Sequence, residues 1–133
     1  MTLEYLQKLF DMKDQLRKQQ ELIDSLWDAA HPGAQKLDGM PHSREPGDKV
    51  GNLAIEIAEL ETQMEKTKAA CAELEPPVLQ FLDSIDDVYI RTIFRLRFFH
   101  AMRWREVAVT VHTSEEAAKE LCYAYLRRSN ANG

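Results

Sequence analysis

Two long runs of apolar residues, spaced alternately by three and four, most constrain how this chain can fold. The first stripe comprises Leu9, Met12, Leu16, Gln19, Ile23, Leu26 and Ala30, and the second comprises Val50, Leu53, Ile57, Leu60, Met64, Thr67, Cys71 and Leu74. This spacing lines up side chains along one side of an α-helix. His31-Pro32-Gly33 and Pro76-Pro77 should end the two helices, because proline cannot continue the helical hydrogen-bond ladder. The sequence therefore predicts two long helices.

The two stripes match when they are laid antiparallel. Ala30 then faces Val50, and Leu16 faces Met64. The match predicts an antiparallel helical hairpin, a coiled coil, in residues 1–75, although two chains could satisfy the same faces between them. Its apolar surface exceeds what two helices can hide, so we expect self-association, most simply as a dimer.

The segment between the stripes is rich in Gly, Pro and charge. We predict a loop over residues 31–48, with Asp48 placed to cap the second helix. His31, Asp38, His42 and Asp48 match no metal-ligand spacing, so neither a metal nor a cofactor is expected.

Charge is distributed unevenly along the chain. Residues 1–89 contain 9 Lys and Arg against 18 Asp and Glu, whereas residues 90–133 contain 8 against 4. A polyanionic partner would therefore meet the second part. No apolar run approaches the ~20 residues of a membrane span, and no signal-peptide pattern opens the sequence. We expect a cytoplasmic protein without membrane contact, in which Cys71 and Cys122 are reduced core residues.

Residues 76–133 predict a second, all-helical domain. VLQFLDSI indicates a short helix after Pro76-Pro77, and Asp86-Asp87 can cap the next one. VYIRTIFRLRFFHAM is too densely apolar for a surface helix and should be buried on several sides. No strand pattern appears anywhere, so the predicted fold class is all-α.

The segment from Trp104 to Leu126 has the layout of a helix-turn-helix. Trp104, Val107, Ala108 and Val111 give one short helix an apolar face, and Ala118, Leu121, Cys122, Tyr125 and Leu126 give a second helix its own. His112-Thr113-Ser114 makes the turn. Two short helices joined by a tight turn are typical of DNA-binding proteins.

Two glutamates occupy the start of the second helix. If Thr113 is its N-cap, Glu116 at the third helical position completes a capping box. Acidic side chains also suit the positive end of a helix. A functional alternative is that a carboxylate accepts a hydrogen bond from cytosine in the major groove.

"LRFFHAMRWREVA", Leu96 to Ala108, resembles the last region of bacterial sigma factors. "PGDKVGN", Pro46 to Asn52, after a Gly/Pro-rich loop and a heptad helix, resembles a family of small phage and prophage proteins. These have a coiled-coil front and a sigma-region-four-like rear, a layout shared with RinA-type activators of late phage genes. The resemblance implies a DNA-binding transcriptional regulator that also contacts RNA polymerase.

This chain departs from the sigma-like pattern at three positions. Arg103 replaces a small hydroxylated residue, and Ala101 and His112 stand where the pattern has glycine. Residues 101–133 carry 5 basic and 4 acidic side chains, so phosphate attraction would be weak unless a dimer doubles it.

The predicted contacts to double-stranded DNA combine basic side chains with two hydroxyl-bearing side chains that can form hydrogen bonds. They are Arg103, Arg105, Lys119, Arg127 and Arg128, with Tyr123 and Ser114. An alternative is a protein-interaction module that kept the fold but binds DNA weakly or not at all, and a third is a helical assembly protein. An enzyme is not expected, because no nucleophile with a base and no carboxylate pair in a cleft is evident.

Overall fold

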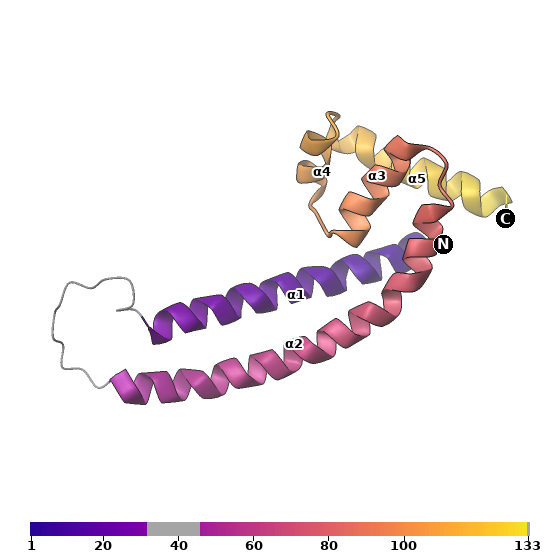
Figure 1. Ribbon diagram of the computed structural model, residues 1–133. Helices are drawn as coiled ribbons and strands as arrows, with labels where there is room; N and C mark the ends of the chain where they lie inside the picture. The colour runs from indigo at the N-terminus through magenta and orange to yellow at the C-terminus, as the bar shows by residue number, and fades with distance from the viewer. Residues whose placement is uncertain (32–45, 133) are drawn as a thin grey trace. The chain divides into compact units, whose positions relative to one another are not determined.

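The computed structural model describes the backbone of residues 1–31 and 46–132 and the side chains of residues 1–31 and 53–131. Every regular element in these ranges is helical, which confirms the all-α prediction. The elements are α1 (Leu3–Ala30), α2 (Pro46–Asp83), α3 (Val88–Phe94), the π-helical segment η2 (Arg95–Phe99), α4 (Trp104–Thr110) and α5 (Glu115–Asn132). Figure 1 labels the five α-helices. No helix within the described ranges combines the length and apolarity needed to cross a membrane.

The chain forms two compact units, and each is described by itself. One unit contains Gln15–Lys68, and the other contains Met1–Asp14 together with Ala69–Gly133. By their contacts, the first fourteen residues thus belong with the C-terminal part of the chain. The domain boundary predicted near residue 75 stays a prediction.

In the unit of residues 15–68, α1 and α2 lie side by side and pack through their apolar stripes (Figure 1). Ile23, Ile57 and Met64 are buried, and Leu16, Leu26 and Leu60 pack against them. All six are stripe residues of the sequence. Gln19, the polar member of the first stripe, has its side-chain oxygen buried without a hydrogen-bond partner among the described residues.

The start of α2 differs from the prediction. The helix begins at Pro46, so Asp48 lies inside α2 and is not its N-cap. Proline suits a first helical turn because the N–H that it lacks has no partner there. The side chain of Asp48, like Asp38 and His42 of the predicted loop, lies outside the described residues.

The predicted end of the second helix at Pro76-Pro77 is wrong. α2 continues through both prolines to Asp83 and includes most of the segment predicted as a separate short helix, Val78 to Asp83. Each proline removes a backbone donor from the helical ladder. Beyond them, however, Val78 and Leu82 are fully buried. Burial of these two side chains favours the continuous helix, which local propensity alone does not.

Most of the apolar segment after α2 is buried as predicted, although Val88 at its start is 63% exposed. Asp87 caps α3, since its Oδ1 accepts hydrogen bonds from the backbone N–H groups of Tyr89 and Ile90 at 2.9 and 3.1 Å. Side chains of α3 and η2 form the centre of this unit, and the fully or nearly fully buried ones are Ile93, Phe94 and Phe98. Phe94 packs edge-on against Phe81, with the two ring centroids 5.2 Å apart.

Candidate nucleic-acid interface

The first helix of the predicted helix-turn-helix forms where the sequence places it. Trp104, Val107 and Ala108 of α4 are buried. Arg103 is the N-cap residue, and Glu106 Oε1 accepts a hydrogen bond from the Arg103 backbone N–H at 2.9 Å. This bond satisfies a donor at the helix start while the Arg103 side chain remains exposed.

The turn after α4 is a Schellman motif. His112 has a φ of 59°, the Thr113 N–H donates to Ala108 O at 2.9 Å, and the His112 N–H donates to Val109 O at 3.3 Å. Ala101, in the loop before α4, has a φ of 55°. Both positions that have glycine in the sigma-like pattern therefore adopt the left-handed backbone conformation that glycine favours.

The predicted cap of the second helix is wrong by one residue. Ser114 caps α5, because its Oγ accepts from the Ala117 N–H at 3.0 Å. Thr113 is instead bound through its backbone to the end of α4. Ala117 thus occupies the third helical position, so Glu116 does not complete a capping box. Glu115 and Glu116 are exposed in the first turn of α5, where the positive helix end favours them.

Tyr89 forms a hydrogen bond to the turn between α4 and α5, and sequence patterns did not indicate this contact. Its hydroxyl donates a hydrogen bond to Val111 O at 2.9 Å. The bond joins the start of α3 to the residue before the left-handed His112. A contact across 22 sequence positions leaves no periodic signal in the sequence.

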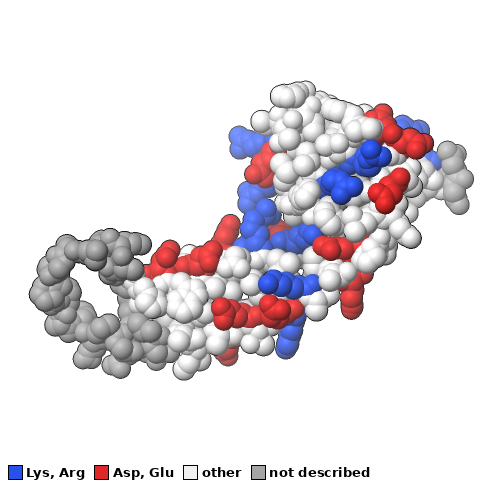
Figure 2. All heavy atoms as spheres, in the orientation of Figure 1, with Lys and Arg blue, Asp and Glu red and all other residues white. Residues whose placement is uncertain are grey.

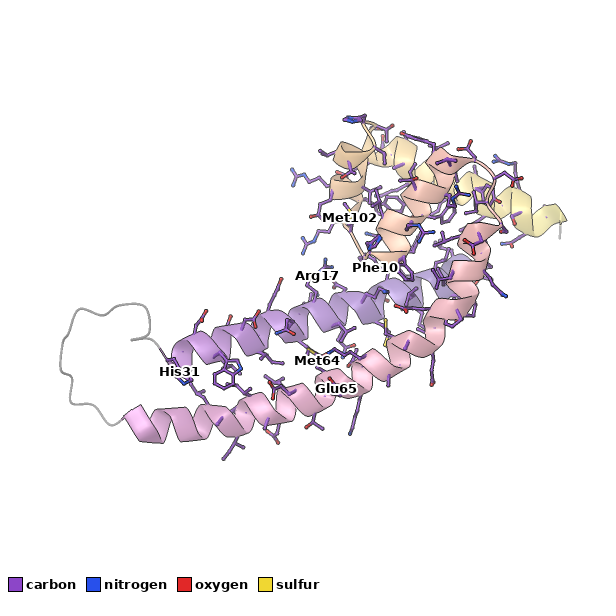
Figure 3. The ribbon with its side chains drawn as sticks, in the orientation of Figure 1. Phe10, Arg17, His31, Met64, Glu65 and Met102 are labelled. Atoms are coloured by element: carbon purple, nitrogen blue, oxygen red, sulfur yellow. The ribbon has the colours of Figure 1, made fainter. Side chains whose placement is uncertain are left out.

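Arg97 of η2 is the second residue that sequence reasoning missed. Its guanidinium carbon lies 3.8 Å from the Phe10 ring centroid and 4.8 Å from that of Trp104, and Nη1 donates to Met102 O at 3.1 Å. Phe10 and Met102 are labelled in Figure 3. Burial lowers the pKa of Arg97, and Nε has no hydrogen-bond partner among the described residues. Arg97 therefore contacts residues of α1, of the loop between η2 and α4, and of α4 itself.

The seven predicted contact residues fall in different places. Arg103 and Arg105 are exposed on either side of buried Trp104, and Ser114 is exposed as the α5 cap.

Lys119, Tyr123 and Arg127 follow at intervals of four and share one side of α5. The Tyr123 ring packs against Trp104 with centroids 6.3 Å apart. Arg128 extends from another side of α5, with its guanidinium 5.9 Å from the Tyr125 ring centroid.

Acidic residues occupy the outward side of α5. At about 3.6 residues per turn, Glu116, Glu120 and Arg127 lie opposite the buried Ala118. Arg127 Nη2 is 2.8 Å from Glu120 Oε2, so the positive charge on this side is neutralised by a neighbour. On the face of this unit that Figure 2 shows, basic and acidic side chains are interspersed. This surface is mixed, in contrast to a continuous basic face.

Neither cysteine is a reactive thiolate. Both side chains are buried, and neither forms a disulfide. Burial raises the pKa of Cys122 to about 12 and also raises that of Cys71. In the part of the chain that the structure describes, no three His, Cys, Asp or Glu side chains gather as metal ligands would.

Comparison of the chain with protein-family models, curated proteins and solved structures finds no match.

Proposed function

We propose that the chain is a DNA-binding transcriptional regulator. Its N-terminal part would be an antiparallel helical hairpin, and α4 and α5 would form a sigma-region-four-like helix-turn-helix. The observation that carries the proposal is the Schellman turn between α4 and α5, which joins the two short helices and leaves the Ser114-capped start of α5 exposed. Arg103 and Arg105 are exposed at the start of α4. Helix-turn-helix proteins present the start of the second helix to the major groove.

In this proposal the basic residues of α4 bind the DNA backbone. Arg103 and Arg105 would contact phosphates, and Ser114 would add a hydrogen bond near the start of α5. Lys119 and Tyr123 lie one and two turns along α5 and would face base edges. With Arg127 paired to Glu120, non-specific affinity is expected to be low, and a dimer on two half-sites would double the phosphate contacts.

Selection of genomic fragments by the purified chain, followed by fluorescence anisotropy over a salt series, tests the proposal. We expect binding that weakens as salt increases, with a slope corresponding to a few phosphate contacts. Absence of salt-dependent binding at low ionic strength would exclude DNA reading.

A second candidate is a protein-interaction module, favoured by the outward Glu116 and Glu120. These carboxylates would repel phosphate and attract a basic protein surface, for example on RNA polymerase or another phage protein. Glu116→Lys separates the candidates. It should strengthen DNA binding if α5 enters a groove, and it should weaken binding to purified RNA polymerase if α5 contacts that enzyme.

We propose that the N-terminal part of the chain is a helical hairpin that self-associates. Labels at Gln20 and Glu61, which are exposed residues of α1 and α2 in the unit of residues 15–68, should give a short intramolecular distance by double electron–electron resonance. A short distance seen only between differently labelled chains would instead indicate pairing of helices from two chains.

A further inference from the structure

An open surface cavity of about 350 Å³ lies between the start of α1 and the stretch of α5 from Tyr123 to Asn130. Both segments belong to the unit of residues 1–14 and 69–133. The lining residues are Thr2, Leu3, Tyr123, Leu126, Arg127 and Asn130. Its volume is at the small end of the range for ligand pockets.

The lining combines apolar walls with hydrogen-bond donors. Leu3 and Leu126 contribute aliphatic surface, and the Tyr123 ring is held in place against Trp104. Thr2, Arg127 and Asn130 contribute polar groups, and none of the six lining residues is acidic. The Thr2 hydroxyl oxygen accepts from the Tyr5 N–H at 3.1 Å, so its own O–H remains a donor. An apolar molecule with one negative end is complementary to this arrangement.

Arg127 can exchange its present partner for a ligand. Its ion pair with Glu120 is 2.8 Å long, but the two side chains are 66% and 65% exposed. Ion pairs this exposed contribute little to stability. A carboxylate held at the cavity would receive charge-assisted hydrogen bonds from the guanidinium.

We propose that this cavity binds a small monocarboxylate with an apolar tail, such as a medium-chain fatty acid. The carboxylate binds Arg127, with Thr2 and Asn130 as further donors, and the tail lies against Leu3 and Leu126. The site shares Tyr123 and Arg127 with the predicted DNA contacts, but its lining comes from the start of the chain and from α5, and its occupancy can be tested without DNA.

Titration calorimetry of the full chain without DNA tests the charge preference, with octanoate, octanol and octylammonium as probes of equal chain length. Octanoate should bind about tenfold more tightly than octanol, which lacks the charge, and octylammonium should bind most weakly. Methyl NMR should place the shifts at Leu3 and Leu126. Equal affinity for the three probes, or shifts elsewhere, would overturn the proposal.

Three substitutions test the assigned groups. Arg127→Gln should abolish the preference for octanoate over octanol, whereas Arg128→Gln, its exposed neighbour outside the lining, should preserve it. Glu120→Gln should tighten octanoate binding severalfold by releasing Arg127 from competition. Leu3→Trp should exclude all three probes by filling the cavity, and circular dichroism should show each variant folded. An octanoate preference that persists in Arg127→Gln refutes the site.

Discussion

The guanidinium of Arg97 lies over the ring of Phe10, with 3.8 Å between the guanidinium carbon and the ring centroid. These residues are 87 positions apart, in η2 and α1. Lys13 repeats the arrangement one helical turn later, with Nζ 4.2 Å from the Phe99 ring centroid and 2.6 Å from Glu75 Oε2. The first turns of α1 therefore stabilise the C-terminal unit through two cations in contact with aromatic rings.

Phe10→Ala should destabilise the chain by about 2 kcal/mol, through lost burial and the lost contact with Arg97. Urea unfolding followed by tryptophan fluorescence measures the change. Phe10→Leu keeps most of the apolar surface and should lose about half as much. If Phe10→Ala lowers the free energy of unfolding by less than about 0.5 kcal/mol, as surface substitutions do, the contact with Arg97 does not stabilise the fold.

His112→Gly should stabilise the chain by up to about 1 kcal/mol, because glycine adopts a φ of 59° without a steric penalty. His100→Gly is the matched control. His100 has an ordinary φ of −94°, so glycine there should destabilise by about 0.5–1 kcal/mol. Thermal unfolding of both variants measures the difference, and a destabilised His112→Gly would contradict the expectation.

Ser114→Ala should cost about 1 kcal/mol, since it removes the acceptor for the Ala117 N–H. Thr113→Ala should change stability by less than about 0.5 kcal/mol, because Thr113 is bound to α4 through its backbone. The two variants can be compared by chemical denaturation. The reverse order would restore Thr113 as the cap.

Stability should fall at alkaline pH because of Cys122. Its pKa is about 12 in the folded chain against 9.0 for an unperturbed thiol, so the folded state keeps its proton where the unfolded state loses it. The contribution is complete below about pH 9 and is lost as the pH rises toward 12, with a slope of about 1.4 kcal/mol per unit for this one group. Urea unfolding from pH 8 to 11 should show a shallower decline in Cys122→Ala, and an unchanged decline would exclude this origin.

Charge variants should shift DNA affinity in opposite directions if the proposed function holds. Arg103→Ala and Arg105→Ala should each reduce the salt slope by about one unit and weaken binding to all sequences alike. Glu120→Gln should strengthen non-specific binding, because it removes a repelled charge and frees Arg127. Anisotropy titrations measure all three, and stronger binding by an arginine variant would argue against phosphate contacts.

Local patterns in the sequence determined much of this protein. The apolar stripes are specified by spacing alone, and Ile23, Ile57 and Met64 are buried as that spacing requires. The Asp87 cap depends on a few neighbouring residues, so its signal is also local. The left-handed positions at Ala101 and His112 were indicated only by the resemblance, because alanine and histidine do not themselves favour that conformation.

Tertiary contacts decided the rest. α2 passes through Pro76-Pro77 because burial of Val78 and Leu82 outweighs two missing backbone donors. The choice of Ser114 as the α5 cap is local, but it depends on where α4 ends, because Thr113 belongs to the turn that closes α4 and the Ser114 Oγ accepts from the Ala117 N–H. Arg97 meets Phe10, and Tyr89 meets Val111, only after distant segments pack together. Sequence periodicity reports which side of a helix is buried, but not which partner it meets, because that depends on the packing free energy of the whole unit.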